Sequence, residues 1–358
     1  MWDCLTRAVK GRVGAWPLCD GASFTRCGLS GRCQTVAMTE ALDRRGLAYG
    51  ASAYVVWGLF PILMAALKPA GAFEIVAWRA LSSLLVCIAI LAAMGAWRRL
   101  RAVASHRPTV LRLSAASVLI AINWGVMVYA VVTDRVASTS LGYYINPLIT
   151  VGLSVLFLGE RLRKLQMVAI SLGAVAVVVI AVEMGGLPWI SLALAFSFAG
   201  YSFIKKGVGG RVDALSGLAI ETAVLAPVAL GVLWVVGSQG DATFLARGAD
   251  GLGWWHDVMM VGTGTWTAGA LLVFAAGARR LPLNITGMLQ YITPTMTFAL
   301  AVWYFGEPMP AGRWAGFGLV WIALTLITVD ARRARPLSRR RAAGLSRAAG
   351  EQPVTEPI

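Results

Sequence analysis

The chain has 358 residues, of which 58% are hydrophobic and only 14% are charged. Together with a mean hydropathy of +0.70, this composition excludes an ordinary soluble globular domain and predicts an all-α polytopic membrane protein. A net charge of +15 is large enough for a nucleic-acid-binding protein. Whether it indicates such binding depends on where the basic residues lie.

Residues 1–45 form a polar, basic extension unlike the rest of the chain. The extension lacks histidine and an apolar core long enough for a signal peptide. It carries four cysteines whose spacings match no Cys-x-x-Cys zinc pattern, so we expect no metal site: Cys4, Cys19, Cys27 and Cys33. We expect a disordered extension, or translation that begins at Met38.

Ten apolar segments follow, each long enough to cross a bilayer as a helix. A hydrocarbon core of about 30 Å takes about 20 residues, because each helical residue rises about 1.5 Å. The predicted spans are residues 46–67, 73–94, 113–132, 137–158, 165–182, 188–204, 215–236, 258–276, 283–305 and 311–329.

The basic residues are distributed unevenly between the two sets of connecting loops. If the N-terminus is internal, the cytoplasmic connections hold thirteen Lys and Arg residues, including Lys205 and Lys206, whereas the opposite loops hold three: Lys68, Arg135 and Arg247. Basic loops resist translocation, so both termini are predicted to be cytoplasmic. The charge then needs no nucleic-acid partner, and we expect the arginine run 332–341, within the basic cytoplasmic tail 331–358, to lie on anionic headgroups.

The stretch 142–160 is similar to the stretch 289–307 at an offset of 147, with eight of nineteen positions identical. The same offset aligns Glu74 with Glu221. The chain is therefore predicted to be duplicated, with one half over residues 46–182 and the other over 183–330. Five spans per half is an odd number, so the halves would enter the bilayer from opposite sides. Inverted repeats of this kind are typical of transporters.

Pro147 and Pro294 fall near the centres of repeat-equivalent spans. Each removes a backbone donor and frees a carbonyl, which in hydrocarbon must face protein or a wet cavity. We predict that these kinks line a central substrate-binding cavity with five neighbouring side chains: Tyr144, Asn146, Gln290, Tyr291 and Thr293. The alternative is that both prolines only bend helices for packing.

Few charged residues lie within the predicted spans, and each needs a partner or a purpose. Glu74 and Arg79 are five residues apart and point in different directions around their helix, so Arg79 requires either an acceptor on another helix or an anionic substrate. Glu221 lies about 9 Å inside its span. A carboxyl at that depth suits proton coupling, and Glu74, its equivalent in the repeat, is a second candidate for this role. The competing interpretation is that Glu221 forms a structural hydrogen bond.

Asn123 and Trp124 lie in mid-span in the sequence AINWGVMVYA, where they would contact either ligand or a neighbouring helix. The span-end acids Glu160 and Glu307 are interpreted as structural. No phosphate-binding loop, catalytic constellation or cofactor motif is present in the sequence, so we expect no enzyme activity, cofactor or resident metal.

Seven stretches together resemble the RarD family of EamA-type transporters, within the drug/metabolite transporter superfamily: WGLFPILMAAL, EIVAWRAL, NWGVMVYAV, SLGYYINPLITVGLSVLFLGERL, PWISLALAFSFAGYSFIKK, VDALSGLAIET and NITGMLQYITPTMTFALAVWYFGEP. The resemblance covers roughly residues 46–330. It implies ten transmembrane helices as two inverted five-helix repeats in a bacterial inner membrane. The family motif residues are Trp57, Pro61, Glu74, Arg79, Asn123, Trp124, Tyr144, Asn146, Pro147, Glu160, Glu221, Tyr291 and Pro294. Where the family pattern has His-Arg, this chain has Trp78-Arg79.

The sequence favours a secondary-active permease that moves a small organic metabolite or drug by alternating access, with a proton as a candidate coupling ion. A non-transporting membrane sensor or assembly protein is the main alternative, and a lipid-modifying enzyme is a third. The expected partners are a small-molecule substrate and the lipid bilayer, and the expected assembly is a monomer or a homodimer.

Overall fold

The computed structural model describes residues 43–158, 163–208, 212–246, 253–281 and 283–350, with the backbone alone for 331–350 and for three short strands nearer the N-terminus. The expectations for the four N-terminal cysteines, for Met38, for Glu160 and for the arginines after residue 331 concern side chains outside this description.

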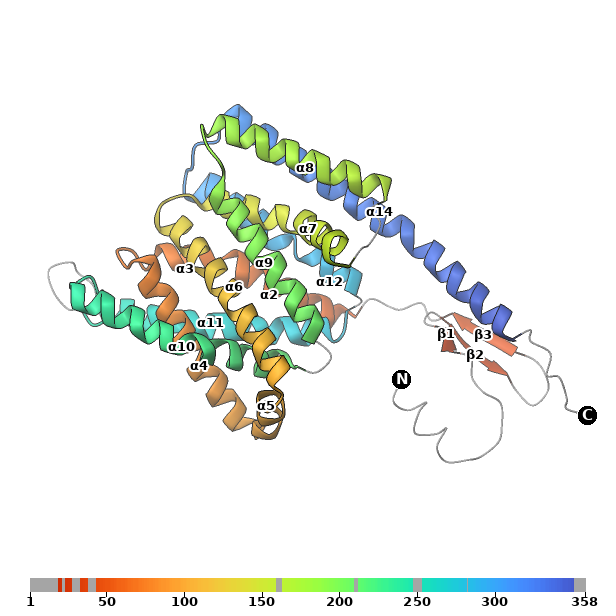
Figure 1. The fold of residues 1–358 in the computed structure, drawn as a ribbon, viewed down its shortest axis with the longest axis horizontal. Helices are drawn as coiled ribbons and strands as arrows, with labels where there is room; N and C mark the ends of the chain where they lie inside the picture. The colour runs from red at the N-terminus through yellow and green to blue at the C-terminus, as the bar shows by residue number, and fades with distance from the viewer. Residues whose placement is uncertain are drawn as a thin grey trace, which may run out of the picture.

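Helices occupy most of the described chain after residue 43 (Figure 1). They are α2 (Arg44–Gly58), α3 (Phe60–Ala65), α4 (Ala72–Ala93), α5 (Trp97–Ala104), α6 (Arg107–Val132), α7 (Val136–Leu158), α8 (Lys164–Glu183), α9 (Trp189–Val208), α10 (Ala214–Gln239), α11 (Trp254–Ala278), α12 (Leu283–Leu289), α13 (Ile292–Ala299), the π-helix η1 (Leu300–Tyr304) and α14 (Ala311–Gly350). The strands β1 (Cys19–Asp20), β2 (Ser23–Cys27) and β3 (Cys33–Ala37) form an antiparallel sheet in that order.

Local sequence signals set several of the helix ends. Asp43 begins α2 by accepting a hydrogen bond from the Arg45 amide at 3.0 Å. Asp213 begins α10 in the same way, with the Ser216 amide as donor at 3.0 Å. Such carboxylates satisfy amides that have no partner within the helix. Gly240 ends α10 in the left-handed conformation, with φ of 80°, which glycine adopts at little cost.

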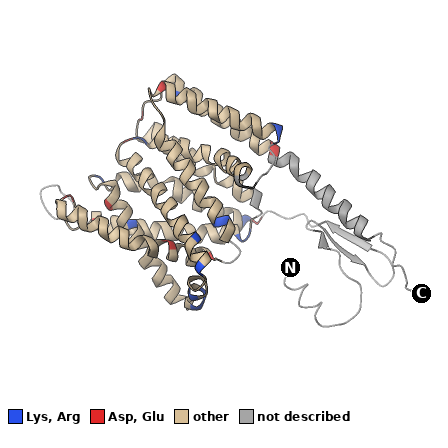
Figure 2. Ribbon diagram, in the orientation of Figure 1, with Lys and Arg blue, Asp and Glu red and all other residues tan. Residues whose placement is uncertain are grey.

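Seven helical stretches of the described chain are long and apolar enough to cross a membrane: α2 with α3, α4, α6, α8, α10, α11 and the part of α14 up to Asp330. The protein is therefore a multi-pass membrane protein. Large apolar side chains such as Val182, Trp234 and Val228 are 65–76% exposed, as expected on a surface that meets lipid. Charged residues gather near the helix ends (Figure 2).

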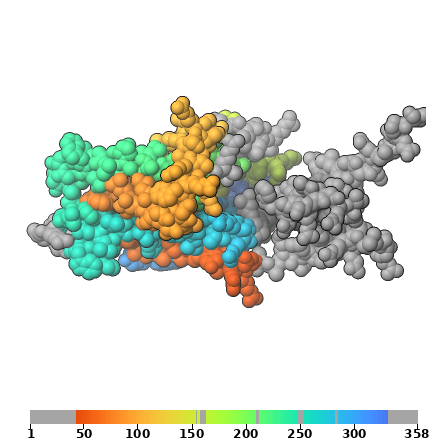
Figure 3. Space-filling model, turned by 90° about the horizontal axis from the view of Figure 1, so that it is seen from below, coloured from red at the N-terminus to blue at the C-terminus, as the bar shows by residue number. Residues whose placement is uncertain are grey.

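The helices pack in pairs that join distant parts of the sequence. α4 packs against α10 and α11, α9 packs against α6 and α7, and α2 packs against α11. α8 and α14 lie side by side along one edge of the bundle (Figure 1). The short helix α5 contacts α6 and α10 at the end of the bundle seen in Figure 3.

Close helix contacts depend on glycine at two points on α11. A Cβ placed on Gly264 would meet the side chain of Ser82 and the backbone of α4, and one on Gly277 would lie 2.7 Å from the backbone nitrogen of Gly50 on α2. Small residues allow helix backbones to approach in this way in membranes. Thus α11 is held tightly against α2 and against α4, the helix that carries the buried arginine described next.

Candidate functional site

Arg79 lies two turns into α4 and is 5% exposed. Its Nε donates a hydrogen bond to Thr267 Oγ1 on α11 at 3.0 Å. The guanidinium carbon lies 4.2 Å from the ring centroid of Phe60 and 4.1 Å from that of Trp124. Cations bind to aromatic faces at such distances. The site thus joins residues from α3, α4, α6 and α11, and it brings the predicted residues Arg79 and Trp124 together.

Asn123 is buried beside Trp124 in a network that joins three helices. Its Nδ2 donates to the Leu194 carbonyl at 3.1 Å and to Ser197 Oγ at 3.2 Å, both on α9. Its Oδ1 accepts a hydrogen bond from the Tyr143 hydroxyl of α7 at 3.1 Å. These bonds fix α6 against α9 and α7, so in this conformation Asn123 holds helices together.

The two proline-containing segments pack against each other. Ser140 Oγ on α7 donates to the carbonyl of Pro294 on α13 at 2.9 Å, and the Tyr144 hydroxyl lies 2.7 Å from Thr295 Oγ1. Thr293 Oγ1 donates to the Tyr54 carbonyl on α2 at 2.8 Å. The predicted residues Tyr144, Thr293 and Pro294 therefore lie at one junction between the two parts of the chain.

The remaining residues of the predicted cavity lie around this junction. α7 continues as a helix through Pro147, whereas Gln290 and Tyr291 occupy the break between α12 and α13. The Tyr291 side chain interacts with those of Gln290 and Thr328. The Oδ1 of Asn146 is buried and has no hydrogen-bond partner among the residues that the structure describes.

Glu74 is 1% exposed in the first turn of α4 and binds the segment that follows α10. Its carboxylate accepts hydrogen bonds from the Thr243 amide at 2.9 Å, the Thr243 hydroxyl at 2.9 Å and the Phe244 amide at 3.0 Å. The Thr243 hydroxyl also lies 3.0 Å from His256 Nε2. We name this arrangement, Glu74 with Thr243 and Phe244, the Glu74 clasp.

Glu221 is 1% exposed on α10 and binds two residues of α9. Lys205 Nζ lies 2.6 Å from Glu221 Oε1, and the Tyr201 hydroxyl donates to Oε2 at 3.2 Å. The predicted acids Glu74 and Glu221 thus lie near opposite ends of the bundle and apart from Arg79. Lys205 belongs to the last turn of α9, although the sequence analysis assigned it to a loop.

Sequence reasoning missed several residues that complete these sites: Phe60, Thr267, Tyr143, Thr243, Tyr201 and Lys205. Most of them stand in or beside the stretches that carried the family resemblance, but a spacing along one helix does not identify a neighbour on another helix. Glu307, which was interpreted as structural, accepts hydrogen bonds from the amides of Val136 and Ala137. A carboxylate in this place stabilises the N-terminus of α7. Burial raises the pKa of the Glu307 carboxyl, and these amide bonds partly offset the effect.

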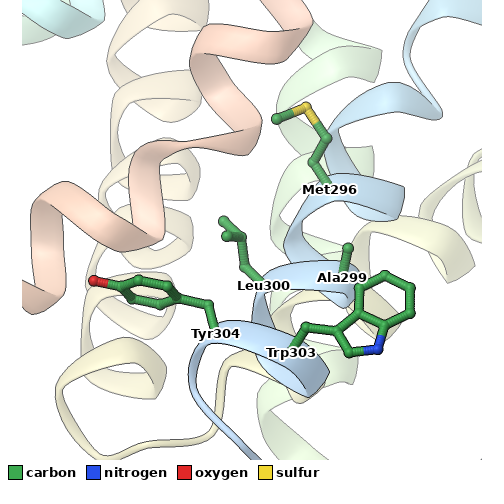
Figure 4. Close-up of a pocket in the computed structure, with 5 residues that line it drawn as sticks. All are labelled: Met296, Ala299, Leu300, Trp303 and Tyr304. Carbon is green, nitrogen blue, oxygen red and sulfur yellow. The ribbon is translucent and has the colours of Figure 1, made fainter.

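A separate depression of about 300 Å³ lies on α13 and η1 (Figure 4). Its lining consists of Met296, Ala299, Leu300, Trp303 and Tyr304. Trp303 is 80% exposed and Tyr304 is 62% exposed, so the depression belongs to the outer surface of the bundle rather than to its buried polar sites.

Comparisons with known proteins identify relatives over most of the chain. The model of the EamA-like transporter family matches residues 44–182. Protein RarD of Streptomyces exfoliatus is 46% identical over 320 residues, which cover 89% of this chain and 99% of that protein. Protein RarD of Escherichia coli (strain K12) is 34% identical over 294 residues, which cover 82% and 97% of the two chains.

Two further matches extend the comparison. An uncharacterized transporter of Bacillus subtilis (strain 168) is 38% identical over 295 residues, covering 81% of this chain and 96% of that protein. One solved crystal structure is similar with a TM-score of 0.54 and 19% sequence identity, and it covers 80% of this chain and 98% of its own. At that identity the structure supports the fold alone.

Proposed function

The chain belongs to the RarD family of EamA-like transporters, and from this membership we propose that it moves a small organic metabolite or drug across the cell inner membrane by alternating access. The general function of the family is membrane transport. One observation supports this mechanism. Glu74 and Glu221 are equivalent in the internal repeat, but Glu74 binds Thr243 and Phe244 after α10, whereas Glu221 binds Lys205 on α9.

We infer ten spans arranged as two inverted five-helix repeats, residues 46–182 and 183–330, with both termini cytoplasmic. Five polar contacts at the helix ends support this topology. In each contact, the topology assigns both residues to the same side of the membrane. Contacts at the external ends are Lys68 with Asp134, Glu74 with Thr243, and Glu307 with Val136. Contacts at the internal ends are Arg163 with Asp330 and Lys205 with Glu221.

The unequal contacts indicate which end is closed. The Glu74 clasp joins the first half to the second half across the external end. Glu221 instead binds Lys205 and Tyr201 within its own half. We infer that the structure represents a state closed to the outside.

The repeat also suggests the opposite state. Applying the offset of 147 to Thr243 and Phe244 gives Ala96 and Trp97, which follow α4. In the state closed to the inside, Glu221 releases Lys205 and accepts hydrogen bonds from the amides of Ala96 and Trp97, while the Glu74 clasp opens. Inverted repeats permit this exchange, because each half can adopt the conformation of the other.

Proton coupling fits this exchange. Protonation of Glu221 removes the charge that holds Lys205, and so frees Glu221 for the other state. Ten residues are proposed to contact substrate during the cycle: Asn123, Trp124, Tyr144, Asn146, Pro147, Gln290, Tyr291, Thr293, Pro294 and Arg79.

Untargeted metabolite comparison of deletion and overexpression strains identifies the substrate, and uptake into proteoliposomes tests transport. We expect a pH gradient to accelerate uptake by the wild type and to have no effect on Glu221→Gln. Lys206→Gln, at the exposed neighbour of Lys205, is the matched control and retains the response. Gradient-driven uptake that Glu221→Gln leaves unchanged contradicts proton coupling, and failure to transport any compound that differs between the strains contradicts the transport function.

A further inference from the structure

Arg79 is the only buried lysine or arginine among the residues that the structure describes. Within this part of the chain no carboxylate lies within 4.0 Å of its guanidinium, since the ion pairs there join other residues. One hydrogen bond, to Thr267, occupies Nε, and Nη1 is buried without a partner. A buried ion normally has a paired countercharge, and an intramembrane ion without one marks a functional site.

A second buried donor lies one helical turn along α4 from Arg79. The hydroxyl of Ser83 is also without a partner, and Ser83 is 0% exposed. Ser83 follows Arg79 by four residues on α4, so both side chains lie on the same face of the helix. A ligand with oxygen acceptors would satisfy both groups, because Arg79 Nη1 and the Ser83 hydroxyl can each donate a hydrogen bond.

The surroundings of Arg79 favour a carboxylate over a more highly charged anion. The guanidinium presents paired N–H groups that match the two oxygens of a carboxylate. A doubly charged phosphate would need further cations, and no other described lysine or arginine is buried near it. The rings of Phe60 and Trp124 add apolar surface that would contact the body of an organic acid.

We propose that Arg79 and Ser83 form the binding site for the carboxylate of the transported molecule, so that the substrate is an organic anion. This inference rests on the proposed transport function and defines its substrate class. A bound carboxylate supplies the countercharge that the described part of the protein does not provide. The site is closed in this structure, since Arg79 is 5% exposed and Ser83 is 0% exposed.

Thermal unfolding of the full-length protein in detergent tests the proposal with matched acids and neutral amides. The probes are benzoate with benzamide, and phenylacetate with phenylacetamide, at equal concentrations. We expect each acid to raise the unfolding temperature of the wild type and its amide to have little effect. Arg79→Met should weaken acid binding at least tenfold. Arg280→Met is the matched control, because Arg280 also lies over an aromatic ring, that of Tyr49 at 5.4 Å, but is exposed.

Acids that stabilise the wild type no more than their amides overturn the proposal, as does Arg79→Met that binds acids as the wild type does. If Arg79→Met is not recovered folded, Arg79→Lys provides the same test, because it keeps the charge and loses the paired donors. An Arg79→Lys variant that prefers acid over amide as strongly as the wild type does then overturns the proposal. Proteoliposome flux separates this inference from the proposed function. Acids that bind but are not transported contradict the function, whereas amides transported faster than acids contradict only the anionic substrate class.

Discussion

Removal of the Glu74 carboxylate should open the end of the protein that we propose to be external. The carboxylate accepts three hydrogen bonds of 2.9–3.0 Å from Thr243 and Phe244. Each bond to a charged, buried acceptor contributes about 1.5–3 kcal/mol, and such contributions are not additive. We therefore expect Glu74→Ala to destabilise the clasp by about 3–5 kcal/mol, and Glu74→Gln, which keeps one carbonyl oxygen, by about 1–3 kcal/mol.

Hydrogen–deuterium exchange measures this effect directly, because the Thr243 and Phe244 amides are themselves donors to Glu74. A loss of about 3 kcal/mol corresponds to roughly hundredfold faster exchange at these amides. Asp257→Ala is the matched control, because Asp257 accepts the next amide, that of Leu245 at 2.9 Å, but on an exposed surface. Exposed bonds of this kind contribute only about 0.5–1 kcal/mol. Equal acceleration in both variants, or unchanged exchange in Glu74→Ala, would refute the reasoning.

Three further variants test the packing, the buried charge and a helix cap. Gly264→Ala should destabilise the protein by about 1–3 kcal/mol because its Cβ would meet α4, whereas Gly262→Ala, which meets nothing within 4 Å, should not lower the unfolding temperature. Without ligand, Arg79→Met should raise stability by about 1–3 kcal/mol, because it removes a buried charge without a countercharge; a lower unfolding temperature would argue for a structural role. Burial opposes ionisation of Asp213, but the amide and hydroxyl of Ser216 hold the pKa of its carboxyl below the usual value. The carboxylate therefore contributes its full stabilisation at pH values above the pKa of Asp213 in the unfolded chain. This stabilisation is lost as the pH falls below about 4. Asp213→Ser keeps the cap without the titration, so a pH profile of unfolding that matches the wild type in this range would contradict that assignment.

The sequence predicted the positions of the helices well, because the length of an apolar stretch is set by the bilayer. α4, for example, covers Ala72–Ala93, against a prediction of 73–94. The sequence predicted a kink at Pro294 within the segment 283–305, and the structure has a break in that segment, between α12 and α13. The equivalent Pro147 leaves α7 continuous, since loss of one backbone hydrogen bond permits either outcome and the neighbouring contacts decide between them.

The partners of the buried polar residues were less accessible to sequence reasoning. The need of Arg79 for an acceptor on another helix followed from its depth, but its contact with Thr267 depends on how α4 and α11 pack. Lys205 was counted among the loop residues that set the orientation of the chain. It lies instead in the last turn of α9, and its long side chain reaches Glu221. Hydropathy does not distinguish a lysine at a helix end from one in a loop.

Alternating access at the buried site is the central claim, and labelling of a single cysteine tests it most directly. In a variant that lacks the five native cysteines, Ser83→Cys places a small thiol beside Arg79 at a position that is 0% exposed. Transport by alternating access predicts that a membrane-impermeant thiol reagent labels this cysteine in both right-side-out and inside-out vesicles, and that Glu74→Gln accelerates the reaction from the outside. Labelling from one side only, or from neither side, would contradict the account.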